Sequence, residues 1–173
     1  MTMWRVALWG TVAALLTLPA VAMQFTHEVQ WGPGDFLFAA VLLGTLAALI
    51  DLSMRRARGF AHRIGGALAA LTGFAQVWIN SAVGIIGDGP NPWNFAFTAI
   101  PLLVLGLAIV LRFRPDTLWR VLGLAALATF AAALTGLGKD PRGAALAMLL
   151  TLPWLLSALL LRWRPADNQG VSP

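Results

Sequence analysis

The side chains of this sequence that could do chemistry are few, and most of them fall in three short polar segments. These segments hold His27, Glu28 and Asp35, then Asp88, Asn91 and Asn94, and finally Lys139, Asp140 and Arg142. Carboxylates and imidazoles bind hard or borderline cations, so the first two segments supply candidate metal ligands: His27, Glu28, Asp35 and Asp88. The spacing of these four residues matches no metal-binding motif, and an acidic loop also serves solubility. General acid–base catalysis by a carboxylate pair would need a nucleophile with a positioned base, which the sequence does not supply.

The sequence has no cysteine and only two histidines, His27 and His62. The absence of cysteine excludes disulfides, thiolate metal sites and cysteine nucleophiles. With so few remaining ligands, we expect no cofactor.

One apolar stretch carries a helical pattern of small and polar residues. At 100° per residue, one arc collects Gly65, Ala69, Thr72, Gly73, Gln76, Asn80, Val83 and Gly87. The opposite side collects Ile64, Leu68, Leu71, Phe74, Trp78, Ile79, Ile85 and Ile86. This division is typical of a membrane helix that packs its small face on other helices and turns its bulky face to lipid.

The amides of Gln76 and Asn80 need hydrogen-bond partners, because an unsatisfied polar group in hydrocarbon costs several kcal/mol. Two interpretations remain open. The amides either join neighbouring helices, or they form one wall of a ligand pocket that opens outward. The residues of that predicted pocket are Thr72, Gln76, Asn80, Asp88, Asn91 and Asn94.

The elements that must position these residues are membrane helices. Of the 173 residues, 59% are hydrophobic and 11% charged, whereas an ordinary soluble domain has about 25% charged residues. The net charge of +5 would suggest nucleic acid in a soluble domain, but here it has a topological cause, so we expect no nucleic-acid partner.

We predict an all-α, polytopic bundle of six transmembrane helices in one domain covering residues 1–173. The expected spans are about 4–24, 36–52, 64–86, 95–113, 118–138 and 144–163. Ten of the twelve basic residues lie in the termini and loops on one predicted side of the membrane. The other two, Lys139 and Arg142, lie on the opposite side. Because loops rich in arginine and lysine stay in the cytoplasm, both termini are predicted to be cytoplasmic.

Three features admit a second interpretation. The first span and the small residues around Ala20 resemble a cleavable signal peptide, whose removal would leave five helices. The segments 38–55 and 97–114 resemble each other, through either duplication or a shared Leu/Ala composition. Asp51 lies four residues before Arg55, which favours a helical ion pair over a proton relay.

The run from Trp78 to Asp88, followed by Asn91-Pro92-Trp93-Asn94, resembles a segment of a group of small uncharacterised bacterial inner-membrane proteins. Upstream residues contribute to the same resemblance, namely Met23, Phe25-Thr26-His27-Glu28-Val29, Trp31 and Asp35-Phe36. It covers about a third of the chain and implies a multi-pass protein of the bacterial inner membrane. It brings no established activity with it.

The leading functional hypothesis is a non-enzymatic binding or accessory subunit with an outward-facing polar pocket. Its expected partners are the lipid bilayer and either another membrane protein or a second copy of the chain. A small-solute transporter or channel is the alternative, and it requires a water-accessible route past Gln76 and Asn80. A membrane-embedded, metal-dependent hydrolase is the third hypothesis, and it requires the four candidate metal ligands to converge.

Overall fold

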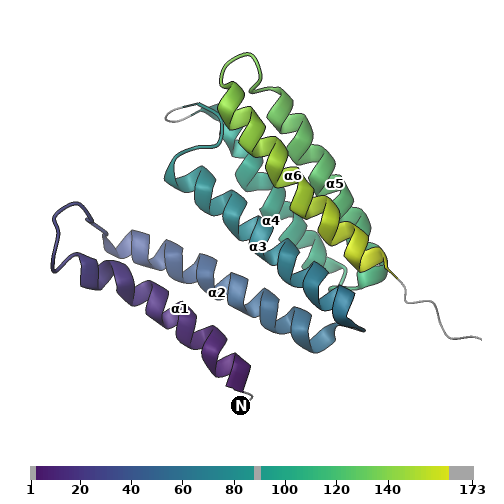
Figure 1. Ribbon diagram of the computed structural model, residues 1–173, viewed down its shortest axis with the longest axis horizontal. Coiled ribbons are helices and arrows are strands. Elements are labelled where there is room, and N and C mark those ends of the chain that lie inside the picture. Colours follow the sequence, from purple (N-terminus) through teal and green to yellow (C-terminus); the bar gives the residue numbers. More distant parts are fainter. Residues whose placement is uncertain (1–2, 88–90, 164–173) are drawn as a thin grey trace, which may run out of the picture. The chain divides into compact units, whose positions relative to one another are not determined.

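The computed structural model describes residues 3–87 and 91–163, and in this part of the chain all regular structure is helical (Figure 1). The elements are α1 (Met3–Ala22), α2 (Pro33–Arg56), α3 (Phe60–Ala82), the short 3₁₀ helix η1 (Pro92–Asn94), α4 (Phe95–Val110), α5 (Pro115–Leu134) and α6 (Pro141–Arg162). The predicted all-α class is confirmed. The helices form two compact units, Met1–Arg56 and Ala57–Pro173, which we call the N-terminal hairpin and the four-helix unit.

Five helical segments are long and apolar enough to cross a membrane, which indicates a multi-pass membrane protein. They are α1, α2, η1 together with α4, α5, and α6. The predicted third span, now α3, is not among them. Its glycines and the amides of Gln76 and Asn80 lower its mean hydropathy.

The N-terminal hairpin is joined by an ion-pair cluster around Asp51, which is 4% exposed. Arg5 of α1 reaches this carboxylate with its Nε 3.0 Å from Oδ1 and its Nη2 3.1 Å from Oδ2. Arg55 lies 3.2 Å from Oδ2, one turn further along α2. The predicted ion pair between Asp51 and Arg55 is confirmed, and Arg5 adds a contact between the two helices.

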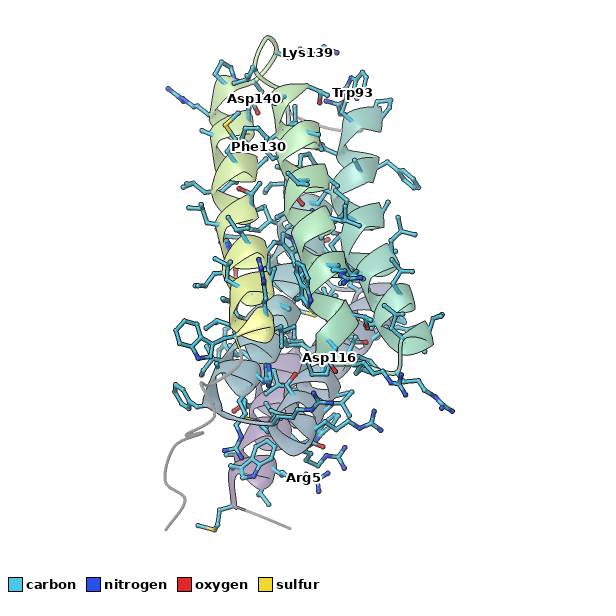
Figure 2. All side chains as sticks on the ribbon, turned by 90° about the vertical axis from the view of Figure 1, so that its right-hand side faces the viewer. Arg5, Trp93, Asp116, Phe130, Lys139 and Asp140 are labelled. Carbon is cyan, nitrogen blue, oxygen red and sulfur yellow. The ribbon has the colours of Figure 1, made fainter. Side chains whose placement is uncertain are left out.

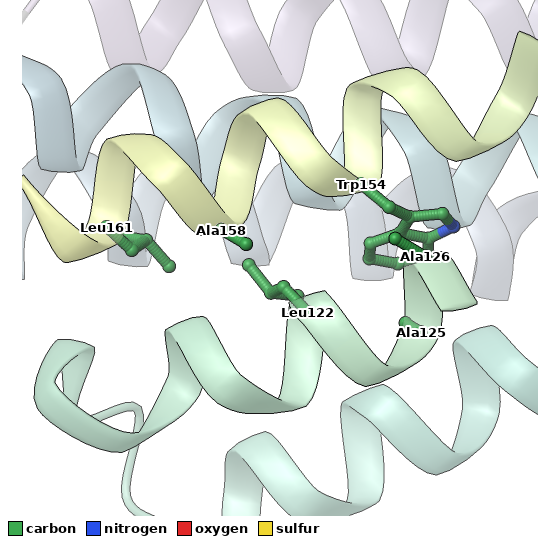
Figure 3. Close-up of a cluster of buried hydrophobic side chains, with 6 residues drawn as sticks. All are labelled: Leu122, Ala125, Ala126, Trp154, Ala158 and Leu161. Atoms are coloured by element: carbon green, nitrogen blue, oxygen red, sulfur yellow. The ribbon is translucent and has the colours of Figure 1, made fainter. Parts of the chain in front are cut away.

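In the four-helix unit, α6 packs against both α5 and α3, and α4 packs against α3 and α5. Figure 2 shows Trp93, Lys139 and Asp140 at one end of this unit and Asp116 at the other. One buried cluster joins α5 to α6 and consists of Leu122, Ala125, Ala126, Trp154, Ala158 and Leu161 (Figure 3). Its alanines allow the two helix backbones to approach closely around the single large indole.

The two faces predicted for α3 are confirmed in part, because the helix also buries Ala70 and Val77, which belong to neither face, and Ile79, predicted to face lipid, packs against a buried cluster. Gly65, Thr72 and Gln76 are buried, whereas Ile64 and Leu71 are 41% and 46% exposed. A Cβ atom at Gly65 would lie 2.9 Å from the Leu160 Cβ. The backbones of α3 and α6 therefore touch at this point, as the small face requires.

The predicted pattern fails beyond Ala82, where α3 ends four residues earlier than the expected span. Ile85 and Ile86, predicted to face lipid, are 2% and 1% exposed, and Val83, predicted to pack inward, is 69% exposed. The physical reason is a change of backbone direction. Gly84 and Gly87 have φ angles of 75° and 68°, which helices do not allow.

Residues 83–87, which we call the reversed segment, follow α3. This segment buries its two isoleucines in a second cluster, together with Phe97, Ala133 and Ala147. Gly136 makes room for this arrangement, because a Cβ atom there would lie 2.8 Å from Ile86 Cδ1. The segment after α3 is therefore part of the packed interior of the four-helix unit.

Candidate functional site

The four-helix unit contains an open cleft of about 730 Å³, lined by both polar and apolar groups, between the end of α3 and the start of α4. Its walls come from the last turn of α3, the segment that follows, η1 and the first turn of α4. The lining residues are Asn80, Ser81, Ala82, Val83, Gly84, Asn91, Pro92, Asn94, Phe95 and Thr98. We call this feature the Asn80 cleft.

Asn80 joins α3 to the start of α4 through its Nδ2, while its Oδ1 makes no hydrogen bond among the described residues. Its Nδ2 donates to the Asn94 carbonyl at 2.8 Å and to the Thr98 Oγ1 at 2.8 Å. Its Oδ1 is buried and has no hydrogen-bond partner among the described residues. A buried acceptor without a partner carries a desolvation penalty that a donor from water or a ligand would remove.

Asn91 and Asn94 build the wall of the cleft by binding the backbone of Ile86. Asn94 accepts from the Ile86 N–H at 2.9 Å and donates to the Ile86 carbonyl at 3.1 Å. Asn91 donates to the same carbonyl at 3.1 Å, and its Oδ1 accepts from the Trp93 N–H at 3.1 Å. These two predicted pocket residues do line the cleft, but their amide groups are used in its construction.

Asp140 fastens the same segment to α6. Its carboxylate accepts from the Gly87 N–H at 2.8 Å and from the Gly143 N–H, as the N-cap of α6, at 3.0 Å. The hydrogen bonds from Gly143 and Gly87 lower the pKa of Asp140 below its ordinary value. A Cβ atom at Gly143 would collide with the Ile85 carbonyl and with Asp140 itself.

The role of Asp140 was not predicted from the sequence, although a signal for part of it exists. An aspartate directly before a proline is typical of an N-cap followed by the first helical position. The neighbouring Lys139 places its Nζ 5.3 Å from the centre of the Trp93 ring, which also links this loop to η1. The bond to Gly87, 53 residues away, has no local signal.

Two predicted pocket residues lie in the packed interior rather than in the cleft. Gln76 is 0% exposed, and its Oε1 accepts from the Trp154 Nε1 at 2.8 Å. Its Nε2 has no partner among the described residues. Thr72 is also buried, and its hydroxyl donates to the Leu68 carbonyl one turn back in α3 at 2.7 Å. Asp88, the remaining predicted pocket residue, lies outside the described residues.

The candidate metal ligands of the N-terminal hairpin do not form a coordination site in the described structure. His27, Glu28 and Asp35 are exposed, and the Asp35 Oδ2 accepts from the Gly32 N–H at 2.8 Å at the start of α2. Residues 3–87 and 91–163 contain no group of three or more His, Cys, Asp or Glu side chains that could hold a metal ion. The convergence that a metal-dependent hydrolase requires is therefore not seen in this part of the chain.

The described lining of the Asn80 cleft offers amides, hydroxyls and backbone groups, and none of its residues titrates near neutral pH. Such a lining can bind and orient a polar molecule. The fold and this site together define a multi-pass α-helical membrane protein with a polar cleft at one end of a four-helix unit. Comparison of the chain with models of known protein families, with curated proteins and with solved structures finds no match.

Proposed function

We propose that this protein is a six-span protein of the bacterial inner membrane, and that its Asn80 cleft faces outward and binds a small uncharged polar ligand. In this proposal the protein acts as a binding or accessory subunit, either with another membrane protein or as a homo-oligomer, and both termini are cytoplasmic.

The packing of α3 supports a sixth span. This helix has 23 residues and is therefore about 34 Å long, which matches a hydrocarbon core of about 30 Å. Gly65 lies against Leu160 near the end of α6, and the Ile85 carbonyl approaches Gly143 at the start of α6. Because α3 runs beside α6 over this length, it crosses the bilayer wherever α6 does.

The distribution of arginines supports the orientation. The end of the four-helix unit opposite the cleft carries Arg58, Arg63, Arg112, Arg114, Arg120 and Arg162. Arginine-rich ends remain cytoplasmic, so the cleft at the other end would open outward.

The observation that carries the binding proposal is the unpaired Oδ1 of Asn80 in the wall of a 730 Å³ cleft. Ser81, the next residue and also part of the lining, is exposed, and its hydroxyl makes no hydrogen bond within the described structure. Since the described lining carries no charge, a ligand with its own hydrogen-bond donor and no net charge fits best.

Transport is the second candidate, and it is favoured by unpaired polar atoms deeper in the four-helix unit. The Nε2 of Gln76 lies one turn before Asn80 on α3, and the Oγ1 of Thr129 lies in α5. Both atoms are buried and lack partners among the described residues. For transport, a route from the cleft to these buried atoms would have to open.

The absence of cysteine in this chain gives a direct test of topology. A single Ser81→Cys variant should react with a membrane-impermeant maleimide added to intact spheroplasts. Thr117→Cys, at the start of α5, should react only after permeabilisation. Ser157→Cys, which is 0% exposed, is the matched buried control and should stay unlabelled. Labelling of Thr117→Cys but not Ser81→Cys in intact spheroplasts would reverse the proposed orientation.

The binding proposal is tested by mass spectrometry of small molecules that co-purify with the full-length protein in mild detergent. We expect a small molecule in the wild type that Asn80→Leu loses and that the control Ser53→Ala, a half-buried serine of the N-terminal hairpin, retains, provided that both variants keep the wild-type melting temperature to within a few degrees. Equal recovery from both variants would contradict binding in the Asn80 cleft. Uptake of glycerol or urea into proteoliposomes distinguishes transport, because a binding subunit should not raise it above that of empty liposomes.

A further inference from the structure

The arginine-rich end of the four-helix unit contains a tryptophan that two arginines contact. The guanidinium carbon of Arg120 lies 5.4 Å from the centre of the Trp119 ring, and that of Arg162 lies 5.2 Å from the same centre. Arg120 belongs to α5 and Arg162 to the last turn of α6. We call these three residues the Trp119 site.

The position of the Trp119 indole is fixed by the core beneath it. Trp119 is partly buried and packs against the cluster that includes Leu122 and Leu161. Arg120 and Arg162 themselves are exposed. The ring therefore holds two exposed, positively charged side chains, each with its guanidinium carbon within 5.4 Å of one indole centre, on a support that the core fixes.

The two guanidinium groups have no anionic partner within the described structure. Asp116, an acid at this end of the described four-helix unit, lies 3.2 Å from Arg58. A cation–π contact with an indole does not use the N–H donors of a guanidinium for hydrogen bonds, and those donors match the oxygens of a phosphate in a bidentate arrangement. An unpaired pair of guanidiniums with free donors is suited to a phosphodiester.

Apolar side chains adjoin the Trp119 site on the side of the helical spans. Leu124 lies one turn after Arg120 on α5, and Leu159 lies one turn before Arg162 on α6, so each shares a face with its arginine. These leucines are 65% and 53% exposed. A soluble phosphate would leave them uncovered, whereas the acyl chains of a lipid would cover them.

We propose that the Trp119 site binds the phosphodiester headgroup of an anionic phospholipid. The inference rests on the membrane location and orientation proposed above, and it is independent of the Asn80 cleft. The cytoplasmic leaflet would supply the lipid, because basic pockets on that side attract anionic headgroups. Binding would tie the start of α5 to the end of α6 through one lipid molecule.

The test uses full-length protein in detergent micelles with equal amounts of a phosphatidylglycerol and a phosphatidylcholine of the same acyl chains. Native mass spectrometry measures the ratio of bound anionic to bound zwitterionic lipid. The double variant Arg120→Gln/Arg162→Gln should lower this ratio by about 5- to 30-fold. The matched control Arg63→Gln/Arg114→Gln removes the same charge from exposed arginines of the same end and should change the ratio by less than about twofold.

Two further arms separate the alternatives. Arg120→Lys/Arg162→Lys keeps the charge but loses the planar donors, so it should also lose most of the preference. Soluble glycerol phosphate at the lipid concentration should not displace the lipid. If the two double glutamine variants lower the lipid ratio equally, the preference depends on net charge alone and the proposal is wrong. Full retention in the lysine variant, or displacement by glycerol phosphate, would also overturn it.

Labelling of Ser81→Cys and Thr117→Cys reports separately on the orientation, and loss of the co-purifying molecule from Asn80→Leu reports on the cleft, so each failure is distinguishable.

Discussion

The indole N–H of Trp154 donates to the Oε1 of Gln76 at 2.8 Å, between side chains that are 78 residues apart in the sequence. Both are almost completely buried, at 1% and 0% exposure. This hydrogen bond joins α6 to α3 in the middle of the four-helix unit, where water cannot replace it. The sequence required a partner for Gln76 but did not show which helix would supply it.

Gln76→Leu should lower the free energy of unfolding by about 1–3 kcal/mol, because it leaves the buried Trp154 N–H without an acceptor. Trp154→Phe removes the donor instead. In the double variant the two losses should fall short of their sum by about 0.5–2 kcal/mol. Reversible unfolding by SDS in mixed micelles measures these values, and strictly additive losses would show that the hydrogen bond contributes nothing.

Gly65→Ala should destabilise the protein by about 1–3 kcal/mol. Its new Cβ would lie 2.9 Å from the Leu160 Cβ and 3.2 Å from the Ser157 carbonyl oxygen, so a helix must move. Gly123→Ala in α5 is the matched control, because nothing lies within 4 Å of its Cβ position. The control should be stabilised by about 0.4–1 kcal/mol through the lower entropy of the unfolded chain. If both variants lose the same stability, the contact between α3 and α6 is not as close as described.

The hydrogen-bonded carboxylate of Asp140 should make the folded protein less stable in acid. Its pKa is lowered by the hydrogen bonds from Gly143 and Gly87, so the folded state favours the charged carboxylate. The resulting stabilisation is fully present above the ordinary value of 3.8 and disappears as the pH falls through the lowered pKa. Asp140→Asn should have a lower melting temperature than the wild type at pH 7, and the difference should shrink on acidification. A difference that stays constant down to about pH 2 would contradict the assignment.

In the N-terminal hairpin, Arg5→Gln should loosen the contact between α1 and α2. The variant leaves Asp51, which is 4% exposed, with Arg55 as its remaining ion-pair partner in the described structure. We expect a local loss of about 1–3 kcal/mol, between the values for exposed and buried ion pairs. Hydrogen exchange followed by mass spectrometry should show faster exchange of α1 amides. Arg56→Gln, an exposed arginine of the same hairpin without an ion pair in the described residues, should leave the exchange unchanged.

The part of the fold that follows from local periodicity could be predicted from the sequence. The spacing of Gly65, Thr72 and Gln76 places them on one face whatever the neighbours are, and the structure buries that face. The pattern misled beyond Ala82 because Ile85 and Ile86 fit the helical repeat even though the helix has already ended. The glycines that reverse the backbone are visible in the sequence, but glycine is also common inside membrane helices.

The candidate site was less predictable, because most of its polar groups bind the backbone of another segment rather than a neighbour on their own helix. Asn94 and Asp140 could be recognised as polar loop residues. Their targets, the peptide groups of Ile86 and Gly87, are set by where the reversed segment is buried. The contact of Arg5 with Asp51 likewise depends on the closure of the hairpin, 46 residues apart in the sequence. Spacing within one helix contains no information on such contacts.

Three side chains, two from η1 with its N-cap and one from the N-cap of α6, hold the peptide groups of Ile86 and Gly87 in place: Asn91, Asn94 and Asp140. A wall fixed in this way already has its final shape before any molecule arrives. An incoming molecule would then be spared the entropy loss of ordering a loop, and even a compound with few contacts could be retained. The same rigidity would make the protein selective by size, since a wall that cannot move aside excludes what it does not fit.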